Sequence, residues 1–186
     1  MPAVLWKQLE TDGHDTCRFK KTATGWSLDG TAVFDHEGHA AALNYTLLCD
    51  SDWTSRQAHV KGWVGQTDID VLIERTDNGH WHINGTNDPN LDDLKDIDLG
   101  FTPATNTNAI RRLNLSNGKE AQSTAIWLDT ADWTVKMLPQ TYRRIDDQNY
   151  AYTSPLHDYQ ATLRVDDFGI VRDYPALWMA IDPKAG

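Results

Sequence analysis

Long apolar runs are missing from this sequence. No stretch approaches the roughly 20 consecutive apolar residues that a transmembrane helix needs, and the N-terminus lacks the basic start and apolar core of a secretion signal. We therefore expect a cytoplasmic protein with no stable membrane insertion. Only two cysteines, Cys17 and Cys49, are present, and they lie far apart in the sequence. In a reducing compartment such a pair usually remains as two buried or half-buried free thiols, and a disulfide or a metal pair is the alternative.

Basic residues are also scarce. The chain has 17 Lys and Arg against 27 Asp and Glu, which gives a net charge of −10. Because nucleic-acid phosphates and anionic membranes would repel such a surface, neither is expected as the main partner. The length of 186 residues and the 40% hydrophobic content fit a single domain, residues 1–186, with a substantial core. The sequence gives no indication of the oligomeric state.

Recognisable catalytic and cofactor motifs are absent as well. The sequence has no Cys-x-x-Cys pair, no Gly-x-Ser-x-Gly turn and no glycine-rich phosphate loop, so we predict no catalytic residue, no cofactor and no metal. The segment His36-Glu37-Gly38-His39 is one residue short of a zinc-binding His-Glu-x-x-His helix. His80 and His82 would share one face of a strand but have no clear third ligand, and the acids of residues 92–98 do not match a calcium loop.

An extended helical period is missing too, and alternation of apolar and polar residues dominates instead. Only residues 91–94 and 176–180 look able to form a helical turn. Pairs that accept positive φ, Asn78-Gly79, Asn84-Gly85 and Asn117-Gly118, separate several of the runs. Short strands at this spacing predict an antiparallel sandwich, barrel or roll. The expected inward residues are Trp26, Leu28, Ala32, Phe34, Leu43, Tyr45, Leu47, Cys49, Ala58, Val60, Val64, Ile69, Val71, Ile73, Trp81, Ile83, Ala121, Ser123, Ala125, Trp127, Trp133, Val135, Met137, Tyr159, Ala161, Leu163 and Val165.

Eight tryptophans are unusually many for a chain of this length. Most should fill a wide β-core, because each indole buries a large area. One or two could instead line a groove and stack on a sugar ring or hold an acyl chain. Trp53 and Trp81 are the candidates for that role, since polar residues surround both in the sequence.

The segment 96–113 combines the polar groups that best suit ligand recognition. We expect a strand with Ile97, Leu99 and Phe101 inward, followed by a polar loop that presents the side chains of residues 102–107. A second strand would then aim Arg111 and Arg112 at opposite faces. The inward guanidinium needs a carboxylate, for which Asp96 or Asp98 is the natural partner. This pair either serves only the structure or lines a cleft that recognises a polar headgroup.

The same segment, Asp-Ile-Asp-Leu-Gly-Phe-Thr-Pro-Ala-Thr-Asn followed by Ile-Arg-Arg-Leu, resembles the signature of the putative glycolipid-binding family of bacteria, a domain of unknown function. Further matches run in order along nearly the whole chain. The chain departs from the family at Asn108-Ala109, where Leu-Pro is more usual. The further matches are Trp26 to Gly30, Leu48-Cys49-Asp50, Trp53, Arg56, Trp81, Gly85, Gln140, Tyr142, Arg144, Tyr150, Tyr152, Val165-Asp166, Gly169, Val171, Asp173-Tyr174-Pro175, Leu177 and Trp178.

The resemblance implies an all-β fold with little helix, in which one many-stranded antiparallel sheet curls into a roll or half-open barrel similar to bacterial lipoprotein carriers. It also implies a lipid or glycolipid ligand in the hollow of that sheet, which is an analogy of shape. An unfilled concave face would form an apolar pocket with a few polar groups at its rim. The predicted ligand-binding residues are Asp98, Thr105, Asn106, Arg111, Arg112, Gln140, Tyr142, Arg144, Tyr152, Trp53, Arg56 and Trp81.

Three functions are compatible with these residues. The leading hypothesis is a cytoplasmic protein that binds a lipid or glycolipid, in which replacement of Arg112 or Arg144 by Ala removes ligand retention and leaves the fold intact. The second is an enzyme acting on a small polar or phosphorylated metabolite, with Asp98, Asp166 and Tyr142 as acid–base groups. The third is a protein-interaction module with exposed aromatic residues.

Overall fold

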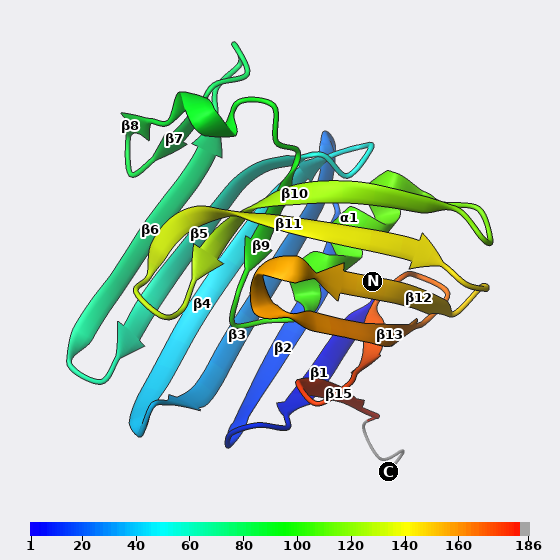
Figure 1. Ribbon diagram of the computed structural model, residues 1–186. Helices are drawn as coiled ribbons and strands as arrows, with labels where there is room; N and C mark the ends of the chain where they lie inside the picture. Colours follow the sequence, from blue (N-terminus) through cyan, green and yellow to red (C-terminus); the bar gives the residue numbers. More distant parts are fainter. Residues whose placement is uncertain (183–186) are drawn as a thin grey trace.

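The computed structural model describes residues 1–182 and contains one continuous sheet of 15 strands (Figure 1). All neighbouring strands are antiparallel except β9 and β10, which run parallel. The first-half strands are β1 (Ala3–Gln8), β2 (Gly13–Lys21), β3 (Gly25–His36), β4 (His39–Asp50), β5 (Ser55–Val64), β6 (Thr67–Arg75), β7 (Trp81–Ile83) and β8 (Thr86–Asn87). The second-half strands are β9 (Asp96–Leu99), β10 (Glu120–Asp129), β11 (Thr134–Arg144), β12 (Asn149–Ser154), β13 (Tyr159–Val165), β14 (Val171–Tyr174) and β15 (Trp178–Ile181).

Three short helical elements complete the fold. They are the 3₁₀ turns η1 (Pro89–Leu91) and η2 (Pro155–His157) and one α-helix, α1 (Ala104–Leu113). Among the described residues, no helix has the length and apolar character to cross a bilayer.

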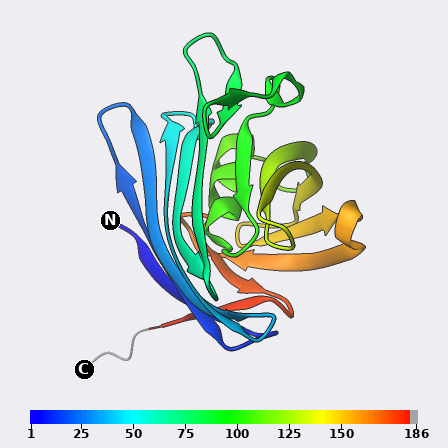
Figure 2. The same cartoon turned by 90° about the vertical axis from the view of Figure 1, so that its left-hand side faces the viewer.

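The strand order places the two chain halves side by side through their first and last strands. It runs β8-β7-β6-β5-β4-β3-β2-β1-β15-β14-β13-β12-β11-β10-β9, so β1 pairs with β15 in the middle of the sheet. The sheet curls until the second-half strands face the long first-half strands (Figure 2). Its far edge then returns to the first half, because Ser55 N donates to Lys95 O (2.8 Å) and Ser55 Oγ accepts from Ile97 N (3.1 Å). The expected curled sheet is therefore confirmed.

Alternation predicted the inward residues of the long strands well. Leu43, Tyr45, Leu47 and Cys49 on β4 are all buried, as are Ile69, Val71 and Ile73 on β6. The thiols of Cys17 and Cys49 are free and buried. Met137 is 49% exposed and contradicts the prediction. Several other predicted inward residues are only half-buried: Trp26, Val64, Ile83, Ala121, Trp133, Val135, Tyr159 and Ala161.

Residues 102–113 contradict the expected loop and second strand, because most of them form α1. This helix lies inside the curl, between the two halves of the sheet (Figure 2). Its residues from Ala104 to Ile110 are all buried, so their Thr and Asn side chains need partners within the protein. The Thr and Asn residues of α1 favour turns in isolation. Within the fold, Asn106 Nδ2 donates to the Tyr142 hydroxyl at 2.9 Å.

Other local expectations also fail. Residues 178–181 form strand β15 rather than a helical turn, and Ala176 before them has a φ of 64°. Asn117-Gly118 does not join two hairpin strands, since it follows α1. Asn84-Gly85 does join the β7–β8 hairpin, with φ values of 48° and 81°.

Candidate functional site

A buried ion pair anchors α1 to the sheet. Arg112 donates from Nε (2.7 Å) and Nη2 (2.6 Å) to the two carboxylate oxygens of Asp96, whose side chain is 2% exposed. Ser123 Oγ donates to the same carboxylate and accepts from Arg112 Nη2 (3.2 Å). The predicted pairing of an arginine with Asp96 is therefore confirmed. Arg112 and Arg111 do not face opposite sides, because they are consecutive residues of a helix and lie about 100° apart around its axis.

The ion pair also changes the expected effect of replacing Arg112. Removing the cation from a buried carboxylate strongly destabilises a folded protein. Arg112→Ala should therefore disturb the fold, contrary to the expectation that the fold stays intact. Arg112 thus has a structural role. If Arg112→Ala lost its ligand, unfolding would explain the loss as well as a missing ligand contact would.

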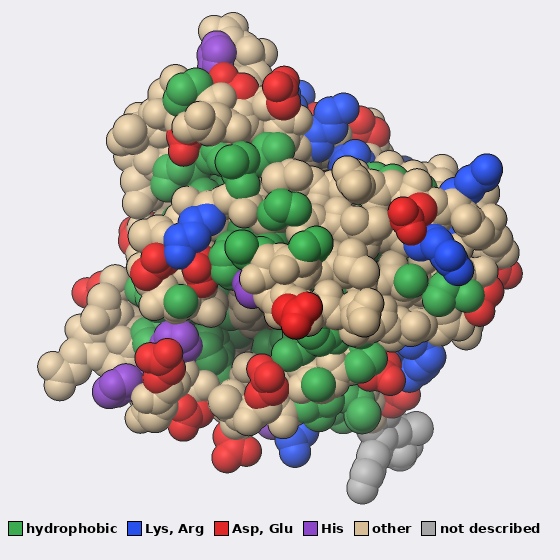
Figure 3. Space-filling model, viewed as in Figure 1, with side chains coloured by type: hydrophobic (Ala, Val, Ile, Leu, Met, Phe, Trp, Pro, Cys, Tyr) green, Lys and Arg blue, Asp and Glu red, His purple; other side chains and the backbone are tan. Residues whose placement is uncertain are grey.

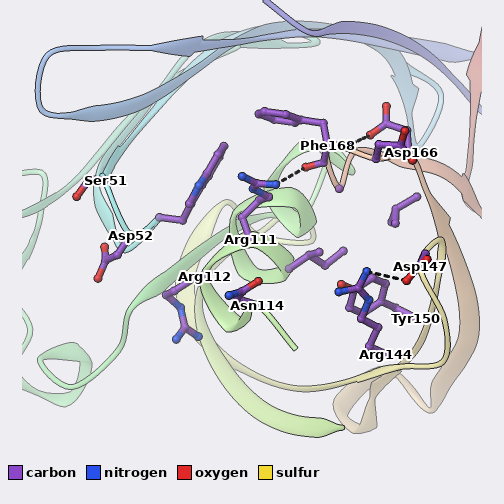
Figure 4. Close-up of a pocket in the computed structure, with 15 residues that line it drawn as sticks. Ser51, Asp52, Arg111, Arg112, Asn114, Arg144, Asp147, Tyr150, Asp166 and Phe168 are labelled. Atoms are coloured by element: carbon purple, nitrogen blue, oxygen red, sulfur yellow. Dashed lines mark hydrogen bonds and ion pairs between the residues drawn. The ribbon is translucent and has the colours of Figure 1, made fainter. Parts of the chain in front are cut away.

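One pocket lies at the C-terminal end of α1. We call it the arginine pocket (Figure 4). Its volume is about 420 Å³. Its lining residues are Ser51, Asp52, Trp53, Ile110, Arg111, Arg112, Asn114, Arg144, Asp147, Tyr150, Val165, Asp166, Asp167, Phe168 and Gly169.

The arginines of this pocket differ in how far the protein satisfies them. Arg144 donates to the carbonyl oxygens of Leu115 (2.9 Å) and Asp146 (3.1 Å). Arg111 lies against two aromatic rings that also contact each other, with its guanidinium carbon 5.4 Å from the Trp53 centroid and 5.0 Å from the Phe168 centroid. Four aspartates share the pocket, so its surface carries charges of both signs.

A second pocket lies at the opposite end of α1 and is rich in aromatic side chains. We call it the aromatic pocket; its volume is about 460 Å³. The face in Figure 3 is hollowed, with hydrophobic side chains inside the hollow and acidic side chains around it. The lining residues of the aromatic pocket are Glu10, Asp98, Gly100, Thr102, Asn106, Trp127, Asp129, Thr130, Leu138, Tyr152, Ser154, His157, Tyr159, Tyr174, Leu177 and Trp178.

A hydrogen-bonded relay of predicted site residues supports the wall of the aromatic pocket. Gln140 Nε2 donates to the Asp98 carboxylate (2.6 Å) and to the Tyr152 hydroxyl (3.0 Å). Tyr142 donates to Gln140 Oε1 (3.4 Å) and accepts from Asn106. Burial raises the pKa of Asp98 to about 6, although the bonds from Gln140 and Thr105 oppose this shift. Asp98 therefore changes its charge near neutral pH.

The structure divides the twelve predicted ligand-binding residues among three places. Asp98, Asn106 and Tyr152 line the aromatic pocket, with Thr105, Gln140 and Tyr142 directly behind them. Trp53, Arg111, Arg112 and Arg144 line the arginine pocket. Arg56 and Trp81 line neither.

These last two residues serve the surrounding structure. Arg56 pairs with Asp50 (2.7 Å). Trp81 is fully buried and donates from Nε1 to Leu94 O (3.1 Å), so it offers no face to a groove. Asp166, a suggested acid–base group, accepts from the backbone amides of Phe168 (3.0 Å) and Ile170 (2.9 Å) and so holds a turn.

Sequence reasoning missed several aromatic residues of the aromatic pocket. Tyr159, Tyr174 and Trp178 come from β13, β14 and β15, which are neighbours in the sheet. The available signal was that inward positions of adjacent strands carry aromatic side chains. Tyr152, Tyr159 and Tyr174 form a contiguous cluster with ring centroids 5.6–6.2 Å apart.

Comparison with known proteins identifies the family. The model of the family described as "Putative glycolipid-binding" matches residues 3–180. The chain belongs to this family. Among solved structures, a DUF1089 family protein from Pseudomonas aeruginosa is similar to this putative glycolipid-binding chain, with 28% identity and a TM-score of 0.78 over 89% of this chain and 91% of that one.

A second solved structure shares only the fold. It is a β-barrel-like protein of the domain of unknown function DUF1849 from Brucella abortus, with 12% identity and a TM-score of 0.51 over 96% of this chain and 93% of that one. No curated protein matches the chain.

Proposed function

We propose that this protein binds an amphipathic small molecule with a sugar headgroup, and that the sugar occupies the aromatic pocket. The observation that carries the proposal is the lining of that pocket, which combines five aromatic side chains with carboxylate and amide groups (Trp127, Tyr152, Tyr159, Tyr174 and Trp178; Asp98, Asn106 and Asp129). Sugars are recognised by this combination, because their C–H faces pack on rings while their hydroxyls need directional acceptors and donors.

The charge of the aromatic pocket indicates which class of sugar headgroup fits it. Its charged lining groups are Glu10, Asp98 and Asp129, and no Lys or Arg of the described residues lines it. A neutral sugar suits this surface better than a phosphorylated one, because phosphate groups are recognised through cations. Leu138 and Leu177 supply apolar contacts for the aglycone.

The position of α1 limits the apolar part of the ligand. The helix occupies the interior of the curled sheet (Figure 2), so the concave face is not an open hollow that could hold long acyl chains. We therefore place the ligand at one end of the helix rather than in the centre of the sheet. We also propose that the protein acts in the cytoplasm, since its two thiols are free. We further propose that it forms one domain, since all its strands belong to one sheet.

Titration calorimetry with short alkyl glycosides tests this proposal. Trp127→Leu should weaken binding by about tenfold, because it removes a ring face worth roughly 0.5–1.5 kcal/mol beyond the buried area. Trp63→Leu is the matched control, since Trp63 is 43% exposed and lines neither pocket. Wild-type protein that binds no glycoside, or two variants with equal affinity, would contradict the assignment.

The pH dependence of glycoside affinity tests the role of Asp98. A charged carboxylate is the stronger hydrogen-bond acceptor for a sugar hydroxyl. Affinity should therefore fall as the pH is lowered through about 6, where Asp98 gains its proton. Asp98→Asn should bind more weakly than wild type at neutral pH and should lose this dependence. Release of free sugar during the titration would instead favour the enzymatic alternative, in which Asp98 transfers the proton.

A further inference from the structure

Arg111 has donors that the protein does not use. Its one hydrogen bond within the described chain runs from Nη1 to Phe168 O and is long, at 3.4 Å. No carboxylate of residues 1–182 forms an ion pair with it, in contrast to Arg112 and Arg144. The adjacent rings of Trp53 and Phe168 both contact the guanidinium and so restrict its position (Figure 4). The result is a positioned fork of N–H groups at a pocket wall.

The neighbouring turn is shaped to hold Arg111 in this position. Gly169, with a φ of 93°, lies so close that a Cβ atom there would stand 3.4 Å from Arg111 Cδ. The carboxylate of Asp166 holds the same turn through the amides of Phe168 and Ile170. The stem of Arg111 is therefore packed, and less conformational entropy remains to be lost when its free edge binds a ligand.

The other charged groups of the arginine pocket disfavour binding of a simple anion or a simple cation. Asp52, Asp147, Asp166 and Asp167 line the same pocket, and together with the net charge of −10 they disfavour a pure anion. Three guanidinium groups disfavour a pure cation equally. A sugar is also disfavoured, because the faces of Trp53 are covered by Trp26, at a centroid distance of 4.6 Å, and by Arg111.

We propose that the arginine pocket binds a small zwitterion. Its carboxylate or phosphate would meet the free edge of Arg111, and its amine would face the aspartates, of which Asp167 is exposed and forms no side-chain hydrogen bond within the described chain. The ligand is either a free metabolite or the headgroup of a lipid with the same chemistry. This site is independent of the sugar site at the other end of α1.

Titration calorimetry with phosphoethanolamine and β-alanine tests the inference, with inorganic phosphate, ethanolamine and glucose as comparators. Arg111→Met keeps an unbranched apolar stem but removes the donors, so it should weaken zwitterion binding by about tenfold or more. Arg143→Met is the matched control, because Arg143 is exposed on β11 and lies outside the pocket. Thermal unfolding of each variant shows that the fold persists.

A second variant separates a zwitterion site from a simple anion site. Asp167→Asn removes one negative charge, so it should weaken phosphoethanolamine binding and strengthen phosphate binding. Asp68→Asn, an exposed carboxylate on β6, should change neither. The inference is overturned if no zwitterion binds, if Arg111→Met equals wild type, or if phosphate alone binds as tightly as phosphoethanolamine.

Vesicles then distinguish the two sources of the zwitterion. Association of wild-type protein, but not of Arg111→Met, with vesicles containing phosphatidylethanolamine would assign the site to a lipid headgroup. Binding of soluble phosphoethanolamine without vesicle association would assign it to a free metabolite. Vesicles containing phosphatidylglycerol, which is anionic and has no amine, provide the comparison. The glycoside titration remains unaffected by Arg111→Met in either case, so failure of this site and failure of the sugar site give different results.

Discussion

One acidic residue inside the curl is buried without a cation beside it. Asp15 on β2 is completely buried, and its carboxylate accepts from the hydroxyl groups of Tyr45 (2.9 Å) and Thr102. Burial raises the pKa of Asp15 to about 7, although these hydrogen bonds partly offset the effect. Thr102 directly precedes Pro103 and α1, so this carboxyl group connects the sheet to the start of the helix.

Asp15 should make stability depend on pH. The unfolded chain loses the Asp proton near pH 4, whereas the folded protein keeps it until about pH 7. Stability contributed by this group is therefore present below about pH 4 and is lost as the pH rises towards 7. Asp15→Asn, which keeps the shape, should be more stable than wild type near pH 8 by up to about 4 kcal/mol.

Urea denaturation of both proteins between about pH 5 and pH 8 measures this difference. The gap between Asp15→Asn and wild type should widen with increasing pH over this interval. A gap that stays constant would show that Asp15 is already charged in the folded protein.

At the level of elements, the sequence predicts the strands far better than the helix. Strands β4 and β6 have one face toward the core and one toward solvent, so alternation identifies them. The helix α1 is buried from Ala104 to Ile110, and its two asparagines have partners in distant strands: Asn106 in β11, and Asn108 in β5 through Ser55 (3.3 Å). Such contacts exist only once the fold has formed, so a local pattern cannot reveal them.

The candidate site could be predicted only in part, because it too depends on contacts between segments far apart in the sequence. Gln140 and Tyr142 of the polar relay were predicted through the family resemblance, and Asp98 as a carboxylate partner for an arginine, a contact that Asp96 makes instead. The aromatic pocket as a whole combines Glu10, residues 98–106 and residues between 127 and 178. Its composition depends on the curl of the sheet, which the spacing of residues along the chain does not specify.

Packing between adjacent strands makes Gly30 irreplaceable. A Cβ atom on Gly30 of β3 would overlap the ring and the hydroxyl of Tyr45 on β4. Because the Tyr45 ring is buried and bonded to Asp15, Gly30→Ala should destabilise the protein by about 1–3 kcal/mol.

Gly38→Ala is the control for this prediction. Gly38 has a φ of 81° and no neighbouring atom within 4 Å of a Cβ, so only backbone strain of about 1 kcal/mol is expected there. Chemical denaturation compares the two variants. A Gly30 variant no less stable than the Gly38 variant would show that Tyr45 moves aside without cost.

At the scale of the whole molecule, the two ends of the chain meet in the interior of one sheet. β1 pairs with β15 through Leu5↔Ile181 to Gln8↔Trp178. Seven strands lie on each side of β1, in the orders β8 to β2 and β15 to β9. The first-half and second-half strands, which enclose α1 (Figures 1 and 2), are thus joined by their hydrogen bonds at this seam as well as by the connection through residues 88–95.

This seam also determines how the molecule should respond to mechanical load. Because β1 and β15 are antiparallel, the start of β1 and the end of β15 lie at the same end of their ladder. A force that separates the two termini therefore breaks the hydrogen bonds of this ladder one after another, instead of loading all of them at once in shear. β15 should detach first, since it has only two paired positions with β14. Single-molecule pulling from the two ends should accordingly show yielding at low force, whereas pulling between residues 3 and 178, at opposite ends of the β1–β15 ladder, should load its hydrogen bonds in shear and meet stronger resistance.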